Sequence, residues 1–124
     1  MGKPDLKALA SGPVAGFKHK VIESPWEGAK AIIAEPTGTA WRDMQEILDQ
    51  LREGEETLTP VEKAELQIRS DVLLFIDIFR DETGNRVFDR NDVDLVKDFY
   101  GPVHAGLVKQ ALDLLQPAED IAAK

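Results

Sequence analysis

Residues 60–80 read PVEKAELQIRSDVLLFIDIFR, and this stretch decides the fold. Apolar side chains recur in it at steps of three or four, which predicts one stripe along the face of a helix. The start signals agree, because Thr59 suits the N-cap, Pro60 suits the first helical position and Glu62 completes a capping box. The stripe consists of Val61, Ala64, Ile68, Val72, Phe75 and Phe79.

The second half of this helix, residues 72–79, is apolar almost all round. A helix that is apolar on every side has to be covered on every side. A helix of twenty residues is about 30 Å long, roughly the width of a small domain. The sequence therefore predicts a central helix whose C-terminal half is wrapped by the other elements.

Two short apolar runs, residues 17–22 and 30–35, precede the helices and are separated by a loop with Pro25 and Gly28. This pattern predicts an N-terminal β-hairpin. An isolated hairpin is marginal in water, so it must pack on the helices or gain a third strand from another copy of the chain. Trp26 in the loop is either an exposed anchor for a partner or a lid over the core edge, and the high average burial of Trp favours the lid.

Capping and breaking residues place the remaining helices. Thr39 is expected to cap a helix that runs to about Arg52 and ends at Gly54, with an apolar stripe of Trp41, Met44, Leu48 and Leu51 and with Ile47 beside it. Asp89 is expected to cap the next helix, Gly101 to stop it, and Pro102 to open the last one.

The predicted fold class is α+β, mainly α, with an N-terminal β-hairpin packed on about four helices around the central helix at 60–80. Residues 1–16 are rich in Gly and Pro and are expected to form a flexible arm. Residues 17–116 are expected to form a single globular domain, and residues 117–124 a C-terminal tail.

Composition restricts the function. The 124 residues include no cysteine, which excludes disulfides and thiolate chemistry. The net charge of −8 disfavours nucleic acid and anionic membranes as partners, because both are bound through clusters of Lys and Arg. The longest apolar run, residues 72–76, is far too short to span a bilayer, and no signal peptide is expected.

Catalytic and cofactor motifs are not found, so an enzyme is not predicted and no cofactor or metal is expected. His19 and His104 belong to different elements, and His104 is expected to cap or pack in the first turn of its helix. The acidic segment 81–92 resembles a calcium loop, but aligning its glycine leaves Phe and Arg where carboxylates are essential. A looser divalent-cation site built from Asp81, Asp89 and Asp92 stays open as a minor alternative.

Four segments of the C-terminal half carry a family resemblance: DVLLFID at 71–77, DETGNRVF at 81–88, YGPVH at 100–104 and LVKQAL at 107–112. Together they resemble the tail assembly chaperones of long-tailed bacteriophages and prophages, over about half the chain. The N-terminal half is similar more loosely, through the strand that ends at Glu35 and the Trp41 helix that follows. The matching positions suit turns, caps and core, and they are Asp81, Gly84, Phe88, Gly101, Pro102 and His104.

The resemblance implies a non-enzymatic protein of the host bacterial cytoplasm that is absent from the mature virion. Proteins of this family bind the long, helix-rich tape measure protein and keep it soluble during tail morphogenesis. The resemblance further implies contact with the major tail protein through a frameshift-extended form, and it is compatible with self-association.

Such a chaperone needs an apolar surface rather than an active site. The candidate contact residues are Trp26, Ile32, Ile76 and Ile78, with core burial as the stronger interpretation of the apolar surplus near the last two. Two alternatives from other classes stay open: an acidic interaction or inhibitor module that mimics nucleic acid, and a carboxylate metal-binding protein.

Overall fold

The computed structural model describes residues 5–115, and its longest element is the predicted central helix, α3, at Pro60–Ile78. The capping box forms as expected. The Thr59 N–H donates to Glu62 Oε1 at 2.9 Å, and the Glu62 N–H donates to Thr59 Oγ1 at 3.1 Å. Every residue of α3 from Val72 onward is buried, so the prediction that the C-terminal half is wrapped on all sides is confirmed.

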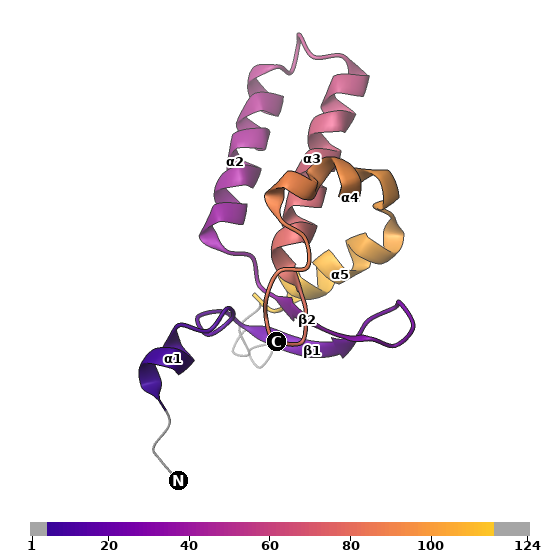
Figure 1. Cartoon of the computed structure of the whole chain (residues 1–124). Helices are drawn as coiled ribbons and strands as arrows, with labels where there is room; N and C mark the ends of the chain where they lie inside the picture. The colour runs from indigo at the N-terminus through magenta and orange to yellow at the C-terminus, as the bar shows by residue number, and fades with distance from the viewer. Residues whose placement is uncertain (1–4, 116–124) are drawn as a thin grey trace, which may run out of the picture.

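The first half of α3 differs from the expectation. Val61, Ala64 and Ile68 lie on the predicted stripe but are exposed, Val61 by 71%. Figure 1 shows the reason: α2 alone runs along α3 over this half, where α4 contributes the surface ion pair between Lys97 and Glu65, whereas α4 and α5 both lie beside the other end. The residues that turn inward there are Leu66 and Ser70. The stripe therefore contributes to the core only from Val72 onward.

The hairpin is confirmed as β1 at His19–Glu23 and β2 at Lys30–Ala34, paired antiparallel with Val21 opposite Ile32. The central helix ends two residues earlier than predicted, because Phe79–Arg80 turns extended and forms β3. This strand pairs antiparallel with β2 and gives the sheet order β1-β2-β3. The hairpin thus gains its third strand from its own chain, and β2 is buried between two neighbours.

Helix α2 spans Gly38–Glu53 and packs antiparallel to α3 (Figure 1). Its N-cap is Thr37, two residues before the predicted Thr39, and Thr37 Oγ1 accepts from the Ala40 N–H at 3.4 Å. The buried face is centred on Ala40, Asp43 and Ile47, so Trp41 and Leu48 stay about half exposed at its margin. The predicted apolar stripe of this helix was centred too close to Trp41. The buried face includes Asp43, and a charged residue is not counted in an apolar stripe.

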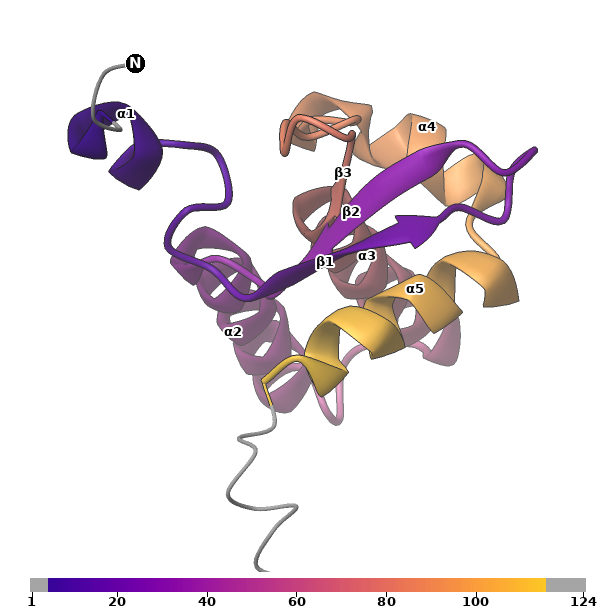
Figure 2. The ribbon, with the colours of Figure 1, turned by 90° about the horizontal axis from the view of Figure 1, so that it is seen from below.

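The C-terminal part contains a short 3-10 turn, η1 at Arg90–Asp92, then α4 at Val93–Phe99 and α5 at Pro102–Asp113. Asp89 was expected to cap the next helix. It caps η1 instead, accepting from the Asn91 N–H at 2.7 Å, and α4 begins only at Val93. Figure 2 shows the sheet crossing the lower end of α3, with α4 on one side and α5 on the other. The β1–β2 turn points toward the junction between α4 and α5.

The N-terminal segment contains a short helix, α1 at Leu6–Ala10, whose N-cap is Asp5. None of its residues is buried, and it stands apart from the other helices (Figure 1). Residues 13 and 14 return to the body and lie against Gly84. The flexible arm at 1–16 remains a prediction, as does the single domain at 17–116. The predicted tail at 117–124 lies outside the described residues.

Gly84 should be sensitive to substitution. Its φ of +91° is a conformation that L side chains rarely adopt, and an added Cβ would sit 3.4 Å from Pro13 Cβ and Val14 Cγ2. We expect Gly84→Ala to lower the free energy of unfolding by about 1–2 kcal/mol. Gly106→Ala, in open space within α5, should instead raise it by about 0.5–1 kcal/mol. Urea denaturation of both variants checks this, and equal effects would contradict it.

Candidate functional site

An apolar pocket of about 390 Å³ opens where the β1–β2 turn meets the junction of α4 and α5. Its floor is formed by Phe75 and Phe79 at the end of α3, with Phe75 only 1% exposed. Its walls come from four other segments: Trp26, Val87 and Phe99 are about half exposed, and Phe88 and His104 are partly buried.

His104 is the centre of the aromatic cluster around this pocket. Its ring centroid lies 5.2 Å from that of Trp26, 5.2 Å from that of Phe75 and 5.4 Å from that of Phe99. Phe75 and Phe79 stack at 5.1 Å with an interplanar angle of 16°. Ring pairs at these spacings contribute about 0.5–1.5 kcal/mol beyond their burial. The walls of the pocket are therefore packed aromatic rings that come from several elements of the fold.

His104 also caps its own helix, as predicted. The Gly101 N–H donates to His104 Nδ1 at 2.9 Å, and Pro102 occupies the first turn. Burial lowers the pKa of His104 below its ordinary value. Burial likewise raises the pKa of the neighbouring Tyr100 to about 12, so both rings are neutral at physiological pH.

This cap predicts a pH dependence. The pKa of His104 is lower in the folded than in the unfolded chain, so the unfolded chain binds more protons as the pH falls below about 6.5. The contribution to stability is complete above that pH and is lost as the pH falls through the folded pKa. Protonation of Nδ1 removes the acceptor for the Gly101 N–H, worth about 1 kcal/mol.

The measurement is the free energy of unfolding between pH 5 and pH 8, a window of about 1.5 units either side of the usual histidine pKa. His104→Gln should flatten the slope in this window. Val21→Ala, a change at an exposed residue of β1 that has no titratable group, should leave the slope as it is in the wild type. An unchanged slope in His104→Gln would contradict the assignment.

The β1–β2 turn fixes Trp26 over the pocket. Ser24 is buried, and its Oγ accepts from the Trp26 N–H and donates to the Trp26 carbonyl, both at 3.3 Å. Glu27 follows with a φ of +57°, a left-handed conformation that is unfavourable for a residue with a side chain. Trp26 packs edge-on against Phe79 at 5.6 Å and remains 41% exposed. It is thus a lid over the core edge that also presents a free face.

The other predicted contact residues behave differently. Ile32, Ile76 and Ile78 are exposed by 6%, 1% and 0% and belong to the core, so they have no surface to offer a partner in this structure. Sequence reasoning missed Phe79, Val87, Phe88 and Phe99 as pocket residues. Phe88 was noted only as a position of the family pattern, and Phe79 only as part of the stripe of the central helix. Their meeting at one pocket depends on the junction of α4 and α5, which local patterns do not place.

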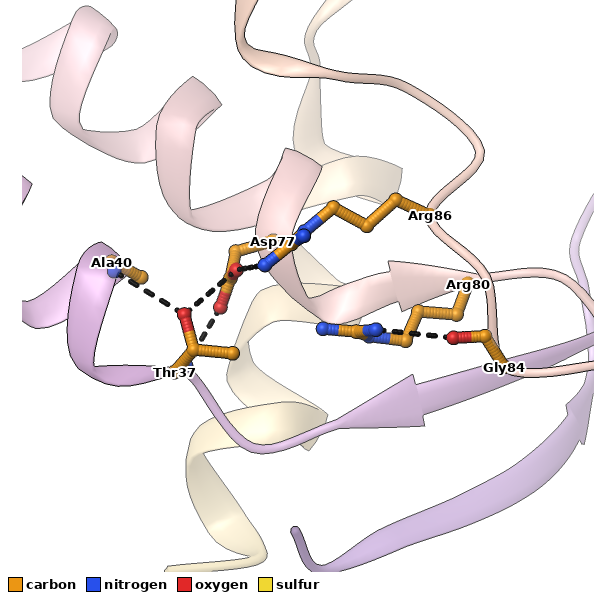
Figure 3. Close-up of polar contacts among 6 residues, drawn as sticks. All are labelled: Thr37, Ala40, Asp77, Arg80, Gly84 and Arg86. Carbon is orange, nitrogen blue, oxygen red and sulfur yellow. Dashed lines mark hydrogen bonds and ion pairs between the residues drawn. The ribbon is translucent and has the colours of Figure 1, made fainter. Parts of the chain in front are cut away.

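A second pocket, of about 540 Å³, lies between the start of α2 and the segment before α4. Four of its charged side chains form two ion pairs. Arg90 Nη2 donates to Asp43 Oδ1 at 3.0 Å, and Arg86 Nη2 donates to Asp77 Oδ1 at 2.6 Å. Figure 3 shows Asp77 bound by both Thr37 and Arg86. These paired charges hold α2 and the loop before α4 to α3.

The three aspartates of the open cation alternative serve the local chain instead. Asp81 Oδ1 accepts from the Thr83 hydroxyl at 2.6 Å and from the Thr83 and Asn85 N–H groups at 2.9 and 3.1 Å. These hydrogen bonds, the one from the hydroxyl most of all, lower the pKa of Asp81. Asp92 Oδ2 accepts from the Asp89 N–H at 2.9 Å. Among residues 5–115, no three His, Asp or Glu side chains are grouped as metal ligands.

No helix within the described part of the chain is both long enough and apolar enough to cross a membrane. The fold and the aromatic pocket together define a small, mainly helical protein whose distinctive surface feature is a pocket that can accept apolar side chains. Clustered, partly exposed apolar side chains are a common feature of surfaces that bind other proteins.

Comparison with known proteins shows the family to which the chain belongs. Residues 5–124 match the family described as phage tail assembly chaperone, and the chain belongs to that family. The solved structure of the bacteriophage HK97 tail assembly chaperone is similar, with 41% sequence identity and a TM-score of 0.74, over 90% of this chain and 97% of that one. No curated protein sequence matches. The family consists of assembly helpers that are not enzymes, and its members bind phage tail proteins.

Proposed function

We propose that this chain binds the tape measure protein and keeps it in solution while the phage tail is assembled in the host bacterial cytoplasm. The observation that carries the proposal is the family match over residues 5–124. A long helical client has apolar stripes that aggregate unless they are covered. The aromatic pocket offers apolar surface of the matching kind, and the net charge of −8 opposes aggregation of a loaded complex.

The proposal includes the later steps of this role. The chaperone leaves before the virion is complete, and a frameshift-extended form brings in the major tail protein. Several copies act on one client. The exposed apolar residues of the first half of α3, Val61 and Ile68, supply surface for such copies.

The experiment is co-expression of this chain with the tape measure protein encoded beside it, followed by pull-down and size-exclusion chromatography. We expect the tape measure protein to move from the insoluble to the soluble fraction and to co-elute with several copies of this chain. Expression of the tape measure protein alone is the control. An insoluble client and a chaperone that elutes alone, with both the short and the extended forms, would refute the proposal.

A further inference from the structure

We infer that the aromatic pocket lined by Trp26, Phe79, Phe88, Phe99 and His104 is the site that receives the client, and that its occupant is a basic amphipathic helix of the tape measure protein. The inference rests on the proposed function and assigns it a site. It combines three observations: the shape and exposure of the pocket, the absence of a strand edge in its described walls, and the charge around its rim.

The pocket is already formed and partly open. Its volume of about 390 Å³ lies within the range of pockets that enclose ligands, about 300–1,000 Å³. Trp26 and Phe99 are 41% and 43% exposed, and Val87 is 47% exposed. Phe75 closes the floor at 1% exposure. Large apolar side chains from a partner can therefore enter between these walls and cover rings that are now in contact with water.

The walls favour a helix as the occupant. They are side chains from a turn, a loop and helix ends, and the backbone at Phe79 is already engaged, since its carbonyl accepts from the Val87 N–H at 3.5 Å. An extended peptide would find no strand edge in these walls to pair with its own N–H and C=O groups. A helix satisfies its backbone internally and brings only side chains, at steps of three and four residues.

The charge around the pocket favours basic residues on that helix. Glu27 follows Trp26 and Asp98 precedes Phe99 in the chain, and both are exposed. The adjacent cation Arg86 turns its guanidinium toward Asp77. Lys and Arg beside the apolar stripe of the client would meet this acidic rim. Such contacts speed association and discriminate between partners.

The rigid β1–β2 turn fits this role. Ser24 holds both the N–H and the carbonyl of Trp26, and Glu27 stays in a left-handed conformation that glycine would adopt more readily. A preformed wall lowers the entropy lost on binding. An unfavourable backbone conformation beside an exposed aromatic ring is the arrangement expected of a recognition element.

The test compares matched variants in co-expression with the tape measure protein. Trp26→Ala removes a wall of the pocket, and Trp41→Ala removes a tryptophan of equal exposure on α2, 42% against 41%. Phe99→Glu places a charge at the rim of the pocket. Leu95→Glu is its control, because it places the same charge one turn earlier on α4, outside the pocket. We expect each pocket variant to reduce co-eluting client at least about tenfold, the loss typical of a truncated hot spot, and each control to stay near wild type.

The charge requirement has its own test. Raising NaCl from about 0.1 to about 1 M shortens the Debye length from about 10 to about 3 Å and should weaken the wild-type complex several-fold. Asp98→Lys at the rim should weaken the complex at low salt, whereas Glu46→Lys on the exposed face of α2 should not. Equal behaviour of these two variants would refute the acidic rim.

The outcomes separate the two proposals. If wild type binds the client and the pocket variants bind equally well, the pocket inference is wrong and the proposed function stands. If wild type binds no client, the proposed function fails and this inference fails with it. If the pocket variants only abolish self-association, or if Trp41→Ala alone abolishes client binding, the pocket is not the client site. The melting temperatures of all six variants are compared with that of the wild type, so that loss of fold is recognised as a separate cause.

Discussion

Phe75→Asp should leave the protein without a stable fold. Phe75 is 1% exposed at the centre of the core and contacts four other rings, those of Phe79, Phe88, Tyr100 and His104, at 5.1–6.2 Å. Truncating a buried Phe costs about 3–5 kcal/mol, and placing a carboxylate there adds a desolvation penalty of several kcal/mol more. The free energy of unfolding of a small domain is about 5–15 kcal/mol in total, so the substitution removes most or all of the stability.

The measurement is thermal and urea unfolding followed by circular dichroism, with Val61→Asp as the control. Val61 lies on the same helix but is 71% exposed, so the same charge should change stability by less than about 0.5 kcal/mol. A Phe75→Asp protein with the spectrum and melting temperature of the wild type would show that α3 does not form the core.

Asp77→Ala should have the second largest effect, a loss of about 3–5 kcal/mol. Asp77 is 6% exposed, and its carboxylate accepts from the Thr37 N–H at 2.7 Å and the Thr37 hydroxyl at 3.0 Å. Arg86 donates to the same carboxylate at 2.6 Å (Figure 3). Its removal leaves these donors unpaired. It also leaves Arg80, which is 4% exposed, beside Arg86 without the nearby anion.

Asp49→Ala is the matched control, because the Asp49–Arg52 pair lies on the surface of α2 at 3.4 Å and should contribute about 0–0.5 kcal/mol. The double variant Asp77→Ala/Arg86→Ala tests the pair itself. Its loss of stability should fall short of the sum of the single losses by about 1 kcal/mol or more, since each single variant strands a partner. Strict additivity would mean that Asp77 acts through Thr37 alone.

Local patterns predicted the helices well where local chemistry sets the boundary. Thr59, Pro60 and Glu62 place the start of α3 within four consecutive residues, and the capping box they form needs no distant partner. Asp89 was likewise recognised as a cap, although it caps the short η1 turn, and His104 was expected to cap or pack and does both. Predictions erred where a distant residue intervened. Thr37 replaced Thr39 as the cap of α2 because Asp77, forty positions away, binds its N–H and hydroxyl.

The candidate site was predicted less completely than the fold. Trp26 stood out as an aromatic residue in a turn, and His104 as a cap. That their rings lie 5.2 Å apart, over Phe75, follows from the packing of the β1–β2 turn against the start of α5. Nothing in the spacing of either segment encodes that contact. Hydrophobic periodicity likewise could not tell the exposed Ile68 from the buried Phe75 on the same stripe.

The sequence by itself determined the mainly helical class, the central helix, the hairpin and the family resemblance, because these depend on period, caps and breakers within a few residues. Only the tertiary structure decided that Phe79 and Arg80 leave the helix to become the third strand, since that requires the edge of β2. It also decided which apolar residues face water and where the aromatic rings gather. These outcomes depend on which elements pack side by side, and that is a property of the whole chain.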